Sequence, residues 1–184
     1  DEWAKEQPDK LALLWTNDEG ECIRFSFKDI KEQSDRAAAY LMSLGIGSGD
    51  MVMLILKRRY EFWLAMLALH KIGAVAIPAT HMLTTHDIVY RNNRASVKAI
   101  ICVDDAYVTE QVKQAMPESP SVKTLIAVTD HGKPIPEGFR DWQAEWRKAP
   151  KFVKPKFVNT NEDTMLMYFT SGTSGEPKMV AHDY

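Results

Sequence analysis

The run Met51-Val52-Met53-Leu54-Ile55-Leu56 decides the fold class of this 184-residue chain. An unbroken apolar run of this length is typical of a strand buried on both faces, as the inner strands of a parallel sheet are. A largely apolar helical segment follows at residues 60–72, Gly73 ends it, and residues 74–78 are the next expected strand. The order strand, helix, strand predicts two parallel strands joined by a helical crossover.

The same alternation continues along the chain. The segment Thr84-Thr85-His86-Asp87 begins a helix, and residues 98–103 return as a strand. Asp104-Asp105 leads a further helix, and residues 125–128 form the next strand. We therefore predict an α/β fold with a largely parallel, doubly wound sheet and flanking helices.

The residues before this core predict a β-hairpin and one helix. Residues 11–15 are apolar, residues 17–20 form a turn cluster, and residues 22–27 alternate between apolar and polar side chains. Ser26 and Asp29 have the spacing of a capping box, which places the start of a helix near residue 28.

One more helix is predicted at residues 139–148, after a loop rich in glycine and proline. Trp142 and Trp146 lie four residues apart, so they share a helix face. We interpret this face as a packing surface, with a partner-binding aromatic stripe as the alternative. Residues 148–156, which contain lysines and prolines, are expected to form an extended surface connection.

Lys57-Arg58-Arg59 follows the first strand of the parallel core. Three adjacent cations are usually a solvated loop, and this is the simpler interpretation. The segment beyond the carboxyl end of a strand is also where ligands bind in open parallel sheets. Both interpretations stay open on the sequence.

The composition excludes several classes of protein. Lys and Arg number 23 against 25 Asp and Glu, so the net charge of −2 offers no basic excess for nucleic acid. The longest apolar run, residues 62–69, is far shorter than a membrane span of about 20 residues. Cys22 and Cys102 lack metal-ligand spacing, so we expect two buried, reduced thiols and no metal site.

The candidate functional segment is Tyr168-Phe169-Thr170-Ser171-Gly172-Thr173-Ser174-Gly175-Glu176-Pro177-Lys178. Residues 164–169 are the expected strand before it, and residues 179–181 the strand after it. Glycines allow close backbone approach, and N–H groups, hydroxyls and one cation suit an oligophosphate. A plain hairpin turn needs only about two to five residues, whereas this loop is longer and ends in a lysine.

The spacing excludes a Walker loop, in which a lysine and a hydroxyl residue directly follow the second glycine. Here Glu176 and Pro177 separate Gly175 from Lys178, and Met179 occupies the hydroxyl position. Pro177 also opposes an immediate helix, because it drives the residue before it toward an extended conformation. We therefore predict a phosphate loop of the strand–loop–strand kind.

The segment from Tyr168 to Lys178 resembles the signature loop of the adenylate-forming superfamily, which includes acyl-CoA synthetases, luciferases and peptide-synthetase adenylation domains. It matches the pattern aromatic-Thr-Ser-Gly-Thr-Thr/Ser-Gly-x-Pro-Lys-Gly up to the lysine, and Met179 replaces the final glycine. Four other segments are similar to the medium-chain acyl-CoA synthetase branch, namely residues 56–63, 77–80, 87–91 and 177–182.

The resemblance implies a two-step reaction in which a carboxylate attacks the α-phosphate of ATP and coenzyme A then displaces AMP. The implied partners are a carboxylic acid, ATP and coenzyme A, with Mg²⁺ as a cofactor. Lys178 would neutralise the phosphates, and Met179 would affect packing rather than phosphate contact. His182 is interpreted as a structural or surface residue rather than a base. The implied phosphate cradle consists of Thr170, Ser171, Gly172, Thr173, Ser174 and Gly175.

Enzymes of this kind are several hundred residues long, so the resemblance implies that residues 1–184 are part of a large N-terminal domain without the C-terminal domain. We expect a hairpin and first helix at 1–50, the core at 51–130, a loop, helix and connection at 131–163, and the strand, phosphate loop and strand at 164–184. No catalytic residue is assigned, because the family's catalytic lysine and metal-binding glutamate would lie outside this chain.

The expected function is therefore that of an acyl-CoA synthetase, and residues 1–184 alone are not expected to turn over. The alternative is a stand-alone module that binds a nucleotide or an acyl adenylate in a regulatory role. A cytoplasmic location is expected, with the mitochondrial matrix as the alternative. The residues indicate neither the oligomeric state nor the identity of the acid.

Overall fold

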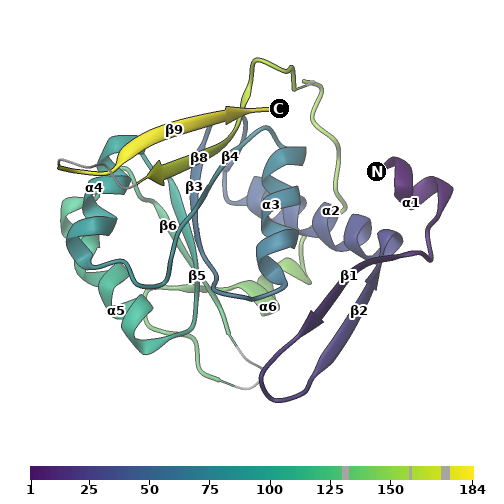
Figure 1. Cartoon of the computed structure of the whole chain (residues 1–184), viewed down its shortest axis with the longest axis horizontal. Coiled ribbons are helices and arrows are strands. Elements are labelled where there is room, and N and C mark those ends of the chain that lie inside the picture. The colour runs from purple at the N-terminus through teal and green to yellow at the C-terminus, as the bar shows by residue number, and fades with distance from the viewer. Residues whose placement is uncertain (130–132, 158, 171–174) are drawn as a thin grey trace.

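The computed structural model describes residues 1–129, 133–157, 159–170 and 175–184, and its centre is a seven-stranded sheet in the order β7-β6-β5-β3-β4-β8-β9 (Figure 1). Neighbouring strands are parallel except for the antiparallel pair β8–β9. The predicted α/β fold with a largely parallel sheet is confirmed. The strands are β3 Met51–Ile55, β4 Val75–Pro78, β5 Ala99–Val103, β6 Thr124–Val128, β7 Arg140–Asp141, β8 Thr164–Thr170 and β9 Lys178–Asp183.

Helices cover both faces of this sheet (Figure 1). The helices α2 Phe27–Ser43, α3 Glu61–Lys71 and α6 Trp142–Trp146 pack on one face, and α4 Thr85–Ala95 and α5 Ala106–Ala115 pack on the other. The short 3-10 helix η1 Met116–Glu118 continues α5.

Alternate residues of β3 contribute to the two hydrophobic cores. Val52 and Leu54 belong to the core under α2, α3 and α6, whereas Met53 and Ile55 belong to the core under α4 and α5. Both faces of the strand are therefore buried, which explains why its sequence is an unbroken apolar run.

Capping boxes begin α2 and α4, as the sequence predicts. The Asp29 amide donates to Ser26 Oγ over 3.1 Å, and the Ser26 amide donates to Asp29 Oδ2 over 2.9 Å. Thr84 and Asp87 form the same pair of hydrogen bonds at α4. Each box satisfies backbone N–H groups that a helix start leaves unpaired.

The N-terminal hairpin is a separate two-stranded sheet of β1 Leu11–Thr16 and β2 Cys22–Ser26, and it projects from the main body in Figure 1. The indole of Trp15 joins it to the core, because Nε1 donates to the Arg58 carbonyl over 2.6 Å and the ring meets the Tyr60 ring edge-on at 5.4 Å.

The prediction of two buried thiols is wrong for Cys22, which is exposed, whereas Cys102 is buried. The reason lies in the alternation of β2. Cys22 and Arg24 lie on its exposed face, and Phe25 is buried. A strand of a two-stranded sheet that packs on one side exposes every second residue.

The predicted helix at residues 139–148 is shorter than expected, because its first residues extend the sheet. Arg140 pairs with Ile126 of β6 as part of the edge strand β7, and Asp141 then caps α6 by accepting from the Ala144 amide over 2.9 Å. Trp142 and Trp146 are buried and stacked at 6.5 Å, which confirms their face as a packing surface.

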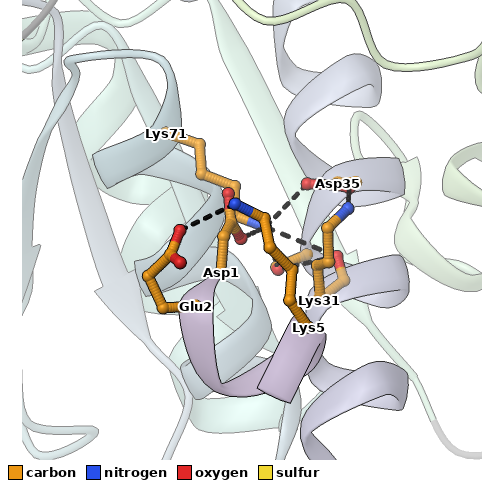
Figure 2. Close-up of polar contacts among 7 residues, drawn as sticks. Asp1, Glu2, Lys5, Lys31, Asp35 and Lys71 are labelled. Carbon is orange, nitrogen blue, oxygen red and sulfur yellow. Dashed lines mark hydrogen bonds and ion pairs between the residues drawn. The ribbon is translucent and has the colours of Figure 1, made fainter. Parts of the chain in front are cut away.

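A cluster of charged residues holds the short N-terminal helix α1, Glu2–Glu6, against α2 and α3 (Figure 2). Lys71 Nζ of α3 lies 2.6 Å from Asp35 Oδ1 of α2 and 3.4 Å from Asp1 Oδ1. Burial lowers the pKa of Lys71 below its usual value, although the hydrogen bond to Asp35 opposes this shift. Lys31 also pairs with Asp35, at 2.6 Å, so one carboxylate serves two cations.

Candidate functional site at the β8–β9 loop

Strands β8 and β9 are the two stems of the predicted phosphate loop. They pair in antiparallel register from Thr164 and Asp183 to Thr170 and Lys178, which are the last partners before the loop. The strand–loop–strand arrangement is therefore confirmed for the stems. Ser171, Gly172, Thr173 and Ser174 lie outside the described residues, so their part in the cradle stays a prediction.

The alternation of β8 fixes which side chains reach the core. Met167 is buried against the α4 and α5 side of the sheet, and Phe169 packs partly against the same core. Tyr168 and Thr170 point away from this core and are exposed. The hydroxyl of Thr170 is therefore available at the carboxyl end of β8.

The described part of the loop resumes at Gly175, a position where the backbone conformation favours glycine. Gly175 has φ +113°, a conformation that residues with side chains rarely adopt, and open space surrounds the position of a Cβ. The sequence then passes through Pro177 to Lys178, which is exposed at the start of β9. A hydroxyl, a glycine backbone and an ammonium group thus lie around one loop, and this set fits an oligophosphate.

Two sequence expectations about neighbouring residues agree with the structure. Met179 is half-buried and packs against the core under α4 and α5, as a packing role requires. His182 is exposed, and its ring meets the Tyr168 ring edge-on at 5.4 Å. Its position fits the interpretation of a surface residue.

Helix α4 contributes residues that sequence reasoning did not connect with the loop. The hydroxyl of Tyr90 donates to the carbonyl of Pro177 over 2.9 Å, although the two residues are far apart in the chain. His86 Nε2 lies 3.7 Å from Glu176 Oε1. Only tertiary packing brings this helix to the loop, so no local pattern in the sequence could have shown it.

A cavity of about 1220 Å³ lies beside β3 and β4, at their carboxyl ends, and its walls include the hairpin residue Trp15, the segment Lys57-Arg58-Arg59 and the segment 78–81. Two of the three cations form ion pairs, Lys57 with Asp105 at 2.6 Å and Arg59 with Glu61 at 3.2 Å. The hydrogen bond from Lys57 is the main reason that the pKa of Asp105 is lowered. The cations thus lie beyond the carboxyl ends of β3 and β4, and a ligand for them stays a prediction.

Residues 1–129, 133–157, 159–170 and 175–184 contain no group of three His, Cys, Asp or Glu side chains placed to hold a metal ion. None of their helices is long and apolar enough to cross a membrane.

Comparison with known proteins identifies the family. The model of the AMP-binding enzyme family matches residues 1–184, the whole chain. The chain belongs to this family. The adenylate-forming resemblance of the loop is thereby confirmed.

Acyl-CoA synthetases of this family resemble the chain along its length. It is 35% identical over 182 residues to the human mitochondrial acyl-coenzyme A synthetase ACSM5, covering 98% of this chain and 30% of that protein. It is 32% identical over 193 residues to the human mitochondrial ACSM1, covering 100% of this chain and 32% of that protein. The chain therefore spans about 30% of the length of these relatives.

Two solved structures share the fold. The acetoacetyl-CoA synthetase of Streptomyces lividans superposes with a TM-score of 0.86 at 22% identity, covering 98% of this chain and 29% of that one. The acyl-CoA synthetase of Brucella canis superposes with a TM-score of 0.81 at 23% identity, covering 96% of this chain and 31% of that one. At this identity the likeness supports the family's fold alone.

Proposed function

We propose that this chain is part of an ATP-dependent, AMP-forming acyl-CoA synthetase and supplies the loop that binds the β- and γ-phosphates of ATP. The observation that carries the proposal is the pairing of Thr170 with Lys178 at the base of the signature loop. This pairing occurs in a chain whose whole length matches the AMP-binding enzyme family.

The reaction follows from the chemistry of this family. A carboxylate attacks the α-phosphate of ATP, the bond to the β-phosphate breaks, and pyrophosphate leaves an acyl adenylate behind. The thiolate of coenzyme A then attacks the acyl carbon, and AMP leaves as the thioester forms. When bound, Mg²⁺ would neutralise part of the charge of the phosphates.

The residues of this chain would act on the leaving pyrophosphate. Its negative charge grows as the bond to the α-phosphate breaks, and donors already held in place stabilise that charge without reorganising. The Thr170 hydroxyl, the backbone near Gly175 and the Lys178 ammonium are the described members of this donor set. Ser171, Gly172, Thr173 and Ser174 complete the proposed cradle.

The relatives suggest the substrate class and the location. Their names describe acyl-coenzyme A synthetases, which supports a carboxylic acid and coenzyme A as the other substrates. Their names also describe mitochondrial proteins, which favours the mitochondrial alternative over the expected cytoplasmic location.

Exchange of labelled pyrophosphate into ATP tests the proposed reaction. The full-length protein should catalyse this exchange only when a suitable carboxylic acid is present, and adding coenzyme A should yield AMP and a thioester. Absence of exchange over a panel of short-chain, medium-chain, branched and aromatic acids would contradict the proposal.

We further propose that residues 1–184 do not turn over alone, since they span about 30% of the length of the related synthetases. The same assay on this segment tests this proposal, because carboxylate-dependent exchange by residues 1–184 alone would contradict it. Nucleotide binding without exchange by the full-length protein would instead favour the regulatory binding module.

A further inference from the structure

One turn of helix α4 touches the β8 stem of the phosphate loop and the residue that directly precedes the β9 stem. The hydroxyl of Tyr90 donates to the Pro177 carbonyl over 2.9 Å, and Pro177 directly precedes Lys178. The ring of Tyr90 also meets the ring of Phe169 edge-on, at 6.2 Å and 73°, and Phe169 directly precedes Thr170. A single side chain therefore contacts the residue before each of the two polar groups at the base of the loop.

Arg91 adds a second contact to the β8 stem. Its guanidinium carbon lies 5.3 Å from the centre of the Phe169 ring. The guanidinium is fixed from the other side, because Nη1 donates to the Asp87 carbonyl over 2.9 Å and to Asp87 Oδ1 over 3.3 Å. Phe169 thus contacts two neighbouring residues of one helix.

Helix α4 is itself held firmly in the fold. Its capping box fixes the first turn, and the Thr85 hydroxyl donates to Gln111 Oε1 of α5 over 2.8 Å. Ile88 is 1% exposed and Asn92 is fully buried, so the helix is anchored along its inner face. The β8–β9 ladder sets the spacing of the two stems, and an element that is anchored elsewhere in the fold can fix how their ends are oriented.

We propose that Tyr90 and Arg91 are positioning residues of the phosphate loop, which fix how the base of the loop, with the Thr170 hydroxyl and the Lys178 ammonium, is oriented toward ATP. This inference rests on the proposed function of the loop. Donors for a leaving group act only when they already point to where the charge develops. Loss of the hydrogen bond from Tyr90 to Pro177 removes the contact that fixes the backbone just before Lys178, and the ammonium group of Lys178 then has to be positioned at each turnover.

The test is Tyr90→Phe in the full-length protein, because this change keeps the ring contact with Phe169 and removes only the hydroxyl. We expect kcat/KM for ATP in carboxylate-dependent pyrophosphate exchange to fall about fivefold, the effect of one lost hydrogen bond. The KM for the carboxylic acid should stay unchanged, and the midpoint of thermal unfolding should fall by no more than the loss of one hydrogen bond explains. Tyr107→Phe is the matched control, because Tyr107 is 47% exposed on α5 and its hydroxyl has no partner among the described residues.

A double-mutant cycle with Lys178→Ala separates positioning from plain stabilisation. If Tyr90 acts through Lys178, Tyr90→Phe should change kcat/KM for ATP less than about twofold once that ammonium is gone. A fivefold fall on both backgrounds, or no fall on either, would overturn the inference. Arg91→Lys keeps the charge but not the planar contact with Phe169, so it should lower kcat/KM for ATP by a smaller factor than Tyr90→Phe does.

Calorimetric titration with ATP distinguishes failure of this inference from failure of the proposed function. If Lys178→Ala slows pyrophosphate exchange but Tyr90→Phe does not, the positioning role of Tyr90 is overturned and the proposed function of the loop stands. A wild-type protein that neither exchanges pyrophosphate nor binds ATP overturns both. A protein that binds ATP without exchange should still show weaker binding after Tyr90→Phe, and equal binding by both forms would reject the positioning role.

Discussion

Thr170 and Lys178 face each other as the last residue pair of the antiparallel β8–β9 ladder. Their backbones are therefore held at the spacing of neighbouring strands, about 5 Å. Both side chains are exposed, so neither is engaged by the core. The register of two strands thus brings a hydroxyl and an ammonium group together at the base of the loop.

Met179 lies directly after Lys178 and should matter for stability rather than for ATP. Its half-buried side chain packs against the core under α4 and α5, so Met179→Ala should lower the free energy of unfolding by about 1 kcal/mol. The KM for ATP should change less than about twofold. Urea unfolding measures the change in stability, and pyrophosphate-exchange kinetics measure the KM for ATP. Met82→Ala, at a residue that is 70% exposed, is the control. A large rise in the KM would show that this residue acts on the phosphates.

Glu61 should be the most costly carboxylate to remove. It is 1% exposed and accepts hydrogen bonds from Arg59 Nη2 and Gln143 Nε2, each over 3.2 Å. Glu61→Ala removes the charged acceptor from both donors, so we expect a loss of about 2 kcal/mol in unfolding free energy. Chemical denaturation measures this loss of unfolding free energy, and Glu110→Ala, at an exposed residue, is the control. Equal effects of the two changes would mean that the buried network adds nothing to stability.

The cluster in Figure 2 predicts a loss of stability in acid. Burial alone would raise the pKa of Asp35, but hydrogen bonds from Lys31 and Lys71 outweigh it, so the pKa lies below its ordinary value of 3.8. A carboxylate with a lowered pKa in the folded state stabilises the fold above its unfolded pKa, and this contribution disappears as the pH falls through the folded value.

Asp35→Asn should therefore destabilise the protein at pH 6 and destabilise it less at about pH 3, because the carboxyl of the unfolded chain is then largely protonated and part of this contribution is lost. Urea-unfolding midpoints at the two pH values measure the difference. Asp9→Asn, at an exposed position away from this cluster, serves as the control. A difference from wild type that is the same at both pH values would mean that the charge of Asp35 has no part in stability.

The two cysteines should differ sharply in reactivity. Cys22 is exposed, whereas Cys102 is fully buried and burial raises the pKa of its thiol. Iodoacetamide should alkylate Cys22 in the native protein on the order of 100-fold faster than Cys102, as peptide mapping can show. Both should react in guanidinium chloride, and Cys22→Ser should abolish the fast reaction. Rapid native labelling of Cys102 would contradict the buried position of β5.

The parts of the fold that depend on local patterns could be predicted from the sequence. The apolar run at 51–56 indicated a strand covered on both faces, and the spacing of Ser26 and Asp29 indicated the start of α2. Strand β7 was missed because two residues carry no periodicity. The exposure of Cys22 was missed because it depends on which face of the hairpin packs against the body.

The same division holds for the candidate site. The composition from Thr170 to Lys178 indicated phosphate binding, and Pro177 indicated that a strand rather than a helix follows. The contacts of Tyr90 and Arg91 with the stems were not predictable, because they join residues that are distant in sequence. They depend on how α4 packs against β8 and β9, which no single segment encodes.

The most direct test of the phosphate-binding role is Lys178→Ala in the full-length protein, measured by carboxylate-dependent pyrophosphate exchange. Because the ammonium group is proposed to neutralise the leaving pyrophosphate, kcat/KM for ATP should fall about 100-fold. The unfolding midpoint should not move, since the side chain is exposed, and Lys151→Ala, at another exposed lysine, should behave like the wild type. Wild-type exchange rates in Lys178→Ala would contradict the assignment of this loop as the phosphate site.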